Sequence, residues 1–366
     1  MARVLLAEPW FGGSHRAWAE GLARHSSHDI SIVSLPPTLW RWRLRAGAAP
    51  LAEALAAEIA RSGQPDVLLV SGLVDVAALL GHLRPRPALP VVVYMHESQL
   101  LYPTVSGAVD ADATLRNWES WRAADAVWFN SAFHRHAVEA ALPAWLAGQP
   151  EMIPDAVVDR VTARFDVVPV GVEAPVGVRP EPGPVPTIVW PHRWEPDKAP
   201  AVFGRALAKL VAAGLDFRLI LAGDDPAESS DRSAIIETHR DRVMACGPFP
   251  GAEFQQLLHE ADIVVSCADH EFFGIGTVEA MLAGCVPVLP NTLSYPDIVP
   301  EKFHDAVLYP SGSFGTRLVD IVGSLDEARR AISGLASSLE PLTWPEAITR
   351  YDIGLSAIVD SSASEL

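Results

Sequence analysis

Short apolar runs alternate with segments of helical spacing along this chain, and the alternation is what most narrows its possible folds. In the first half, four runs have the length and composition of strands, and helix-compatible segments follow most of them. The runs are Arg3–Ala7, Asp66–Ser71, Pro90–Met95 and Asp125–Asn130, and the helix-compatible segments are His15–His25, Val74–Leu83 and Ala132–Leu142. This rhythm is typical of a parallel sheet covered by helices. The first half therefore predicts an α/β domain.

The alternation restarts after residues 172–186, which hold several Pro and Gly residues without periodicity and so indicate a linker. The later strands are Thr187–Trp190, Phe217–Ala222 and Val243–Cys246, and the later helices are Ala199–Ala213 and Gly251–Glu260. Because 366 residues exceed the usual size of one core, we expect domains over residues 1–175 and 184–342, with a C-terminal helix within 343–366. Residues 142–164 are irregular and predict no element, and residues 361–366 are expected to fray.

Composition excludes some classes of function. A net charge of −17 argues against a large nucleic-acid surface that ignores sequence. Residues 1–180 carry a net −3 and residues 181–366 a net −14, so the acidity lies in the second half and a local polyanion contact is permitted in the first. No run approaches the roughly 20 apolar residues of a membrane span. The three cysteines lack metal spacing, which indicates reduced thiols in a cytoplasmic protein.

Two glutamates lie eight positions apart in Glu271–Glu279, between strand-like runs at Asp262–Cys267 and Val286–Leu289. A glycine-containing turn and a helix start separate the glutamates, so the segment predicts a strand, a loop, a helix and a second strand. Free backbone N–H groups and the helix dipole make the start of such a helix an anion site. A diphosphate fits that site.

Charged residues also follow the first strand of the second half, where Arg193 and Lys198 lie within the segment His192–Lys198. One interpretation is that both are exposed charges at a helix start. A cation near a helix N-terminus opposes the dipole, however, which favours a role for Lys198 beside an anion. Asp224 and Asp225 follow the next strand and are more typical of a turn or cap than of a metal site.

Two groups of glycines and polar residues lie at strand ends in the first half, where parallel sheets bind ligands. They are Gly12, Gly13 and Ser14 after the first strand, and His96, Glu97 and Gln99 after the third. His96 has two interpretations of nearly equal weight. It contacts a donor sugar or acceptor, or it is a structural histidine hydrogen-bonded beside Glu97. On the helix that Ser131 is expected to cap, His134, Arg135 and His136 are expected on the solvated face.

Arginines alternate with an aromatic residue in the segment Trp40–Arg45. Aromatic and Arg side chains together are the groups that hold unstacked nucleic-acid bases. The candidates for such a contact are Arg41, Trp42, Arg43 and Arg45. An equally weighted alternative is that Trp40 and Trp42 are buried in the first domain while the arginines stay solvated.

Several of these segments together resemble the glycosyltransferase-like family that includes tRNA-queuosine α-mannosyltransferase. They are Phe11–His15, Trp40–Arg45, His96–Pro103, Phe129–Ser131 and His192–Lys198. The resemblance implies the GT-B fold, which is two Rossmann-like doubly wound α/β domains facing a cleft, with the C-terminal helix crossing back to the first domain. It implies a retaining, metal-independent transfer of mannose from GDP-mannose to a hydroxyl of queuosine in a tRNA anticodon loop.

The resemblance also implies roles for individual residues. Glu279 holds the donor ribose and Glu271 faces the donor sugar. Phe273, Gly274 and Ile275 offer backbone N–H groups to the phosphate or the sugar. Arg193 and Lys198 neutralise the leaving diphosphate, a need that follows from the charge that bond breaking places on its oxygens. Donor contacts are also implied for Gly12, Gly13 and Ser14, a contact to the donor sugar or acceptor for His96, and acceptor contacts for Glu97, Gln99, Arg41, Trp42, Arg43 and Arg45. No metal ion is expected.

Three other functions stay open. In the first, the chain is a glycosyltransferase for a small-molecule, glycan or lipid-precursor acceptor, which the net charge slightly favours. In the second, it is a GT-B hydrolase or epimerase. It is alternatively a catalytically silent module that binds a sugar nucleotide or RNA. The presence of Glu279, Lys198 and Arg193 argues against the silent module.

Overall fold

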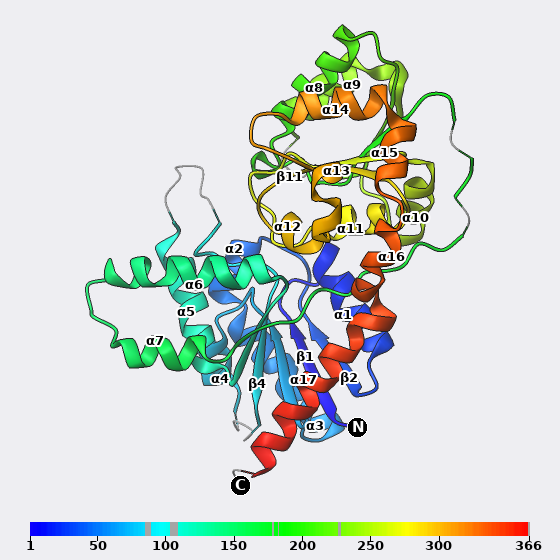
Figure 1. The fold of residues 1–366 in the computed structure, drawn as a ribbon. Coiled ribbons are helices and arrows are strands. Elements are labelled where there is room, and N and C mark those ends of the chain that lie inside the picture. The colour runs from blue at the N-terminus through cyan, green and yellow to red at the C-terminus, as the bar shows by residue number, and fades with distance from the viewer. Residues whose placement is uncertain (85–88, 103–108, 178, 182, 226–227, 365–366) are drawn as a thin grey trace. The chain divides into compact units, whose positions relative to one another are not determined.

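The computed structural model describes residues 1–84, 89–102, 109–177, 179–181, 183–225 and 228–364. Pro103, which contributes to the family resemblance, lies outside them. The chain divides into two compact units, one formed by Met1–Gly171 with Trp344–Leu366 and the other by Val172–Thr343 (Figure 1). The described residues of the predicted linker, 172–186, are therefore part of the second unit, where Val172 pairs with Thr343. No described helix has the length and apolar character needed to cross a membrane.

The first unit contains a six-stranded parallel sheet in the order β2-β1-β3-β4-β5-β6. Its strands are β1 (Arg3–Glu8), β2 (Asp29–Ser34), β3 (Val67–Ser71), β4 (Val91–Met95), β5 (Ala126–Phe129) and β6 (Phe165–Val167). Every residue of β3 and β4 is buried, as expected for central parallel strands that are covered on both faces. The prediction of a parallel sheet is confirmed, although β2 and β6 were not among the predicted strands.

Helices cover the sheet of the first unit. They are α1 (Gly13–His25), α2 (Trp40–Ala46), α3 (Ala48–Ser62), α4 (Val76–His82), α5 (Ala111–Ala123), α6 (Ala132–Ala147), α7 (Asp155–Thr162) and α17 (Trp344–Ser364). The prediction of irregular chain over residues 142–164 was wrong. Helix α6 continues through Pro143, and α7 follows, because Leu142, Leu146 and Val161 are buried in the core and hold both helices in place.

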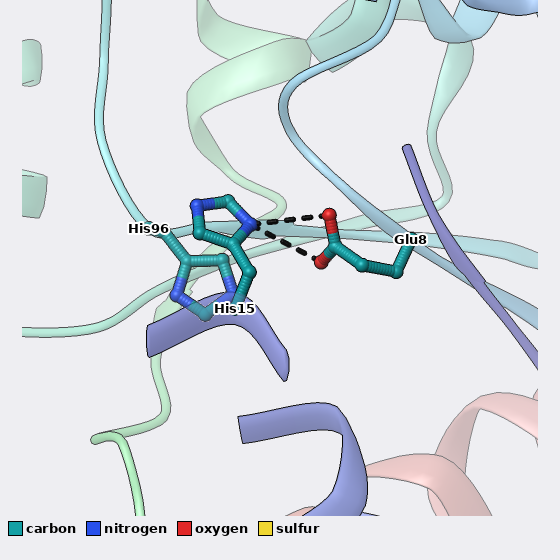
Figure 2. A group of neighbouring side chains, drawn as sticks. All are labelled: Glu8, His15 and His96. Atoms are coloured by element: carbon teal, nitrogen blue, oxygen red, sulfur yellow. Dashed lines mark hydrogen bonds and ion pairs between the residues drawn. The ribbon is translucent and has the colours of Figure 1, made fainter. Parts of the chain in front are cut away.

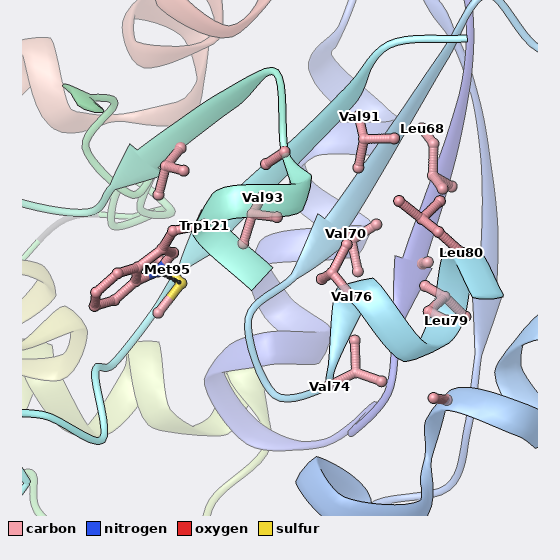
Figure 3. Packing of buried hydrophobic residues seen from close by; sticks show 14 of the residues in the cluster. Leu68, Val70, Val74, Val76, Leu79, Leu80, Val91, Val93, Met95 and Trp121 are labelled. Carbon is pink, nitrogen blue, oxygen red and sulfur yellow. Dashed lines mark hydrogen bonds between the residues drawn. The ribbon is translucent and has the colours of Figure 1, made fainter. Parts of the chain in front are cut away.

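One face of the sheet packs into an apolar core with α3, α4 and α5. Figure 3 shows Val91, Val93 and Met95 of β4 in this core, with Trp121 of α5 beside them. The Trp121 indole N–H donates to the Met95 sulfur at 3.4 Å, so the one polar atom of this ring has a partner. This packing fixes the carboxyl end of β4, where His96 begins the next loop.

Helix α17 packs on the first unit at Trp344. Its indole lies where glycines leave room, because a Cβ built on Gly21 would stand 2.2 Å from Trp344 Cε2 and one on Gly171 would stand 2.4 Å from Cδ2. Farther along α17, the Tyr351 hydroxyl donates to the Pro169 carbonyl at 3.0 Å. The helix extends to Ser364, past the point where fraying was expected, and residues 365–366 lie outside the described chain.

The second unit repeats the architecture with a parallel sheet in the order β12-β11-β10-β7-β8-β9. Its strands are β7 (Thr187–Trp190), β8 (Arg218–Leu221), β9 (Val243–Cys246), β10 (Ile263–Val265), β11 (Val286–Pro290) and β12 (Leu308–Tyr309). Its helices are α8 (Pro200–Ala212), α9 (Ser230–Thr238), α10 (Gly251–Glu260), α11 (Ile275–Leu282), α12 (Tyr295–Ile298), α13 (His304–Val307), α14 (Phe314–Gly323), α15 (Leu325–Ala331) and α16 (Leu335–Leu339). Short 3₁₀ turns complete it at η1 (Pro196–Lys198), η2 (Arg240–Arg242), η3 (Glu301–Phe303) and η4 (Glu340–Leu342). Strands β7 and β10 are adjacent, which brings the loops that follow them to the same edge of the sheet.

Candidate active site

Lys198 and Glu271 meet at the edge formed by the loops after β7 and β10. The Lys198 ammonium donates to the His270 carbonyl at 2.7 Å and to Glu271 Oε2 at 3.3 Å, and it lies 3.2 Å from Asp197 Oδ2. Ala199 takes a left-handed conformation, with φ of 52°, between η1 and α8. That turn lets Lys198 point away from the helix it precedes and into the carboxylates.

Pairing of opposite charges determines the ionisation states of Lys198 and Glu271. Burial acts to lower the pKa of Lys198, but the carboxylates of Glu271 and Asp197 outweigh burial and raise it. Burial acts to raise the pKa of Glu271, yet Lys198 holds it below its usual value, assisted by a hydrogen bond from the Phe273 backbone. Lys198 and Glu271 are therefore a charged pair at neutral pH. The interpretation of Lys198 as an exposed charge was wrong, because the residue is only 9% exposed.

Arg193 and His192 lie in the same loop but in different environments. The Arg193 side chain is 50% exposed and contacts Glu195 at 3.1 Å. His192 is buried, and its Nε2 lies 3.2 Å from the Val265 carbonyl. Burial lowers the pKa of His192 to about 4, so the ring is neutral near pH 7. No role of its own was predicted for His192, because a histidine after a strand has no signal that separates support from catalysis.

Gly274 makes the turn into α11. It has φ of 86° and ψ of 57°, a left-handed conformation that glycine adopts without strain. A Cβ at this position would stand 3.4 Å from Glu271 Cγ, which is ordinary contact, so the backbone conformation and not the available space is what favours glycine here. Within the described chain, no backbone hydrogen bond is formed by the N–H groups of Gly274 and Ile275. The start of α11 thus presents donors suited to an anion.

Glu279 lies on α11 and is not part of the Lys198 ion pair. Gln255 Nε2 donates to its Oε1 at 3.4 Å. Burial, followed by the nearby charge of Glu173, raises the pKa of Glu279 to about 8. Because that pKa lies above 7, the carboxyl is mostly protonated at neutral pH, and it can both donate to and accept from the hydroxyls of a ribose.

A second polar cluster lies in the first unit, at the ends of β1 and β4 and the start of α1. His15 Nδ1 lies 3.1 and 3.2 Å from the two carboxylate oxygens of Glu8, and His15 Nε2 lies 3.5 Å from Glu97 Oε2. The rings of His15 and His96 are 4.1 Å apart between centroids, and Figure 2 shows them one over the other beside Glu8. His96 and Glu97 were predicted as site residues, whereas no role was predicted for Glu8 or His15.

The other residues predicted for this side of the chain take different positions. Gly12 caps α1, where a Cβ would meet Pro37 at 2.6 Å, and Gly13 has φ of 48°. Ser14 is exposed. Gln99 is 4% exposed, and its backbone N–H donates to Asn117 Oδ1 at 2.7 Å.

The four residues of α2 that were predicted to contact RNA have different surroundings. Trp42 is 63% exposed, and the Arg41 guanidinium lies 4.9 Å from the centre of the half-buried Trp40 ring. Arg43 donates to the Pro36 carbonyl at 3.0 Å. Arg45 pairs with Asp112 at 2.7 Å and with Asp110 at 3.3 Å. The alternative in which Trp42 is buried was wrong, and the carboxylates beside Arg45 cancel its charge.

Two further expectations can be compared with the structure. Ser131 caps α6, as predicted, by accepting from the His134 N–H at 3.0 Å. The expectation that His134 lies on a solvated face was wrong, because its ring is fully buried and lies 2.8 Å from Asn130 Oδ1. Asp225 accepts from the Ser229 N–H at 2.8 Å and contacts Arg232, which agrees with a turn.

Comparisons with known proteins identify the class of protein to which this chain belongs. A family description for the N-terminal part of tRNA-queuosine alpha-mannosyltransferases matches residues 3–172, and one for group 1 glycosyl transferases matches residues 185–326. Sucrose-phosphate synthase from Thermosynechococcus elongatus has a TM-score of 0.76 at 14% identity, covering 98% of this chain and 100% of its own. The catalytic domain of starch synthase IV from Arabidopsis thaliana, bound to ADP and acarbose, has a TM-score of 0.72 at 12% identity, covering 98% and 99%.

These structural neighbours have the GT-B fold, so the predicted fold class is confirmed. The chain is a glycosyltransferase. The tRNA-queuosine alpha-mannosyltransferase of Drosophila melanogaster is 32% identical to it over 314 residues, which is 82% of each chain. The chain belongs to the tRNA-queuosine alpha-mannosyltransferase family, as its sequence motifs had indicated.

Proposed function

We propose that this glycosyltransferase moves mannose from GDP-mannose to a hydroxyl of queuosine in tRNA, with retention and without a metal ion. The observation that carries the proposal is the 32% identity to the Drosophila tRNA-queuosine alpha-mannosyltransferase over 82% of both chains. A relationship of that length includes both units rather than one shared domain.

The second unit binds the donor. The N–H groups at the start of α11 receive the diphosphate, and Glu279 accepts hydrogen bonds from the ribose hydroxyls. Lys198 has three N–H bonds, and its contacts to Asp197 and Glu271 are longer than its contact to the His270 carbonyl. A phosphate oxygen replaces one of those two carboxylates, and Glu271 then faces the donor sugar. Arg193 adds a second cation for the charge that develops as the C–O bond breaks.

The first unit binds the acceptor. His96, Glu97 and Gln99 contact the sugar or the hydroxyl that attacks it, and the exposed part of α2 contacts RNA. We assign no protein carboxylate as a nucleophile. The oxygen of the leaving phosphate receives the acceptor proton on the same face of the sugar, which gives retention at the anomeric carbon.

The test is transfer with purified protein, GDP-mannose and tRNA that contains queuosine, followed by mass spectrometry of the nucleosides. We expect a hexosylated queuosine whose anomeric configuration, read by NMR, is the same as in the donor. Transfer should continue in excess EDTA. The same tRNA prepared without queuosine is the matched control for the acceptor, and UDP- and ADP-sugars are the controls for the donor.

Three outcomes would overturn parts of the proposal. Transfer to the queuosine-free tRNA would remove queuosine as the acceptor. Transfer to neither tRNA, while free queuosine or a glycan is modified, would remove tRNA as the acceptor. The second of these is the alternative that the net charge of −17 favours, because an acidic surface repels RNA. Loss of activity in EDTA that added divalent ions restore would remove metal independence.

A further inference from the structure

Four ionisable residues form a cluster in the first unit: Glu8, His15, Glu97 and His96. Contact with an acceptor does not require all four. We propose that His15 is a positioning residue, held as an imidazolium between the Glu8 and Glu97 carboxylates, and that it keeps the stacked ring of His96 neutral. His96 is then a hydrogen-bond acceptor for a ligand hydroxyl. The role of His96 toward a hydroxyl rests on the proposed function, whereas the charge state of His15 does not.

Geometry around His15 requires a proton on each ring nitrogen. Nδ1 lies 3.1 and 3.2 Å from the two oxygens of Glu8, and Nε2 lies 3.5 Å from Glu97. Carboxylates accept hydrogen bonds, so Nδ1 donates to Glu8, and a proton on Nε2 faces the Glu97 carboxylate. Glu8 is fully buried and also accepts from the Trp10 backbone N–H at 2.9 Å, which fixes its carboxylate in place.

Electrostatics agree with that geometry. Burial acts against a charged His15, but Glu8 and Glu97 outweigh burial and raise the pKa of His15 to about 10. The other polar group at Nδ1 is the Ser71 hydroxyl, at 3.3 Å, which is neutral. The cation is therefore present throughout the physiological range.

Burial and the His15 cation act in the same direction on His96. The ring of His96 is 8% exposed and lies between His15, Trp18 and Tyr94. Burial comes first, and the charges of His15 and His134 add to it, so the pKa of His96 is held well below its usual range. His96 Nε2 has no hydrogen-bond partner within the described chain. A neutral, buried imidazole with an unused nitrogen is an incomplete site, and a hydroxyl completes it.

A metal ion is the competing occupant. One ligand atom each from Glu8, His15 and His96 lies within 4.8 Å of the others, and His and Glu are ligands that Zn²⁺ accepts. The Nδ1 of His15 faces both oxygens of Glu8 at nearly equal distances, however, which is the arrangement of an N–H donor shared by a carboxylate. A proton satisfies all the contacts around His15 without moving a side chain.

The test is a pH titration of the ring nitrogens in the full chain, labelled with ¹⁵N-histidine and followed by NMR without any substrate. His15→Gln and His96→Gln assign the two rings. We expect His15 to stay doubly protonated to about pH 9 and His96 to stay neutral well below the ordinary histidine pKa of 6.5. In Glu8→Gln the pKa of His15 should fall by about one unit or more. Glu20→Gln is the matched control, because it removes a solvent-accessible carboxylate from α1, the helix that carries His15.

Activity provides a readout that a merely structural role would not change. Removing the cation in His15→Gln should raise the pKa of His96. The acid limb of the pH profile of kcat/KM should then move to higher pH by about one unit, so that kcat/KM at a given pH on that limb falls about tenfold. If Glu8→Gln does not fold, Glu97→Gln serves the same titration. A wild-type His15 that titrates near its ordinary pKa would overturn the proposal. So would one equivalent of Zn²⁺ that survives dialysis and removes the imidazolium signal. Neither result depends on the donor or acceptor.

Discussion

Lys198 and Glu271 form a charged pair, 3.3 Å from Nζ to Oε2, at the edge of the sheet where β7 and β10 end. The pair holds an ammonium ready at the site proposed for the diphosphate. It also prevents two carboxylates, Asp197 and Glu271, from facing each other without a cation.

Replacing Lys198 with Met should therefore change both activity and stability. Loss of a cation at the leaving group is expected to lower kcat by about 10²–10³-fold. Leaving the two carboxylates without it should cost about 3–5 kcal/mol of unfolding free energy. Steady-state kinetics and urea unfolding measure the two effects. Lys209→Met, on the exposed face of α8, is the control. A Lys198→Met protein with near wild-type turnover and an unchanged fold would contradict the phosphate assignment.

Glu279 predicts a stability effect that depends on pH. Its folded pKa of about 8 lies above the usual value for a glutamate, so the folded state binds a proton more tightly than the unfolded state does. Stability from this proton is present at low pH and is lost as the pH rises from about 4.5 through 8. Glu279→Gln should therefore raise Tm by at least about 2 °C more at pH 8.5 than at pH 5.

Above pH 8, where Glu279 is ionised, the same substitution should weaken binding of the donor nucleotide, because an amide oxygen is a poorer acceptor for ribose hydroxyls than a carboxylate is. Thermal shift across the pH range, with and without GDP, measures both effects. Glu253→Gln, on the exposed surface of α10, should show neither. Equal Tm changes at both pH values would show that Glu279 is not desolvated in the folded protein.

Sequence patterns predicted the architecture because alternating strands and helices carry it locally. They also predicted β9 and α10 with the bounds that the structure has. Residues 142–164 were missed because Pro143 is a local helix-breaking signal, and burial of Leu142 and Leu146 outweighs it. The pairing of Lys198 with Glu271 joins residues 73 positions apart, so no local pattern contains it. Glu8 was missed for the same reason, because its partner His15 lies on a different element.

Close packing of α17 predicts the effect of a single methyl group at Gly21. A Cβ there would stand 2.2 Å from Trp344, which is buried and cannot move into solvent. Gly21→Ala should lower the unfolding free energy by about 1–3 kcal/mol through overpacking. Gly81→Ala is the matched control, because Gly81 is exposed on α4 and a Cβ there meets nothing within 4 Å. Helix propensity should make that control more stable by about 0.5–1 kcal/mol. A stabilised Gly21→Ala protein would show that α17 is not packed as described.

Helix α2 predicts that its charged and aromatic residues contribute differently to tRNA binding. Arg41 is exposed, so Arg41→Ala should weaken binding and lower the slope of log K against log salt concentration by about one. Trp42→Ala should lose about 1–3 kcal/mol of stacking with little change in that slope. Arg45→Ala should leave the slope unchanged, because Asp110 and Asp112 already neutralise the guanidinium. Fluorescence anisotropy with a queuosine anticodon stem-loop over a range of salt concentrations measures all three. If Arg45→Ala changes the slope as much as Arg41→Ala does, the ion pairs of Arg45 open on RNA and the division of roles along α2 is wrong.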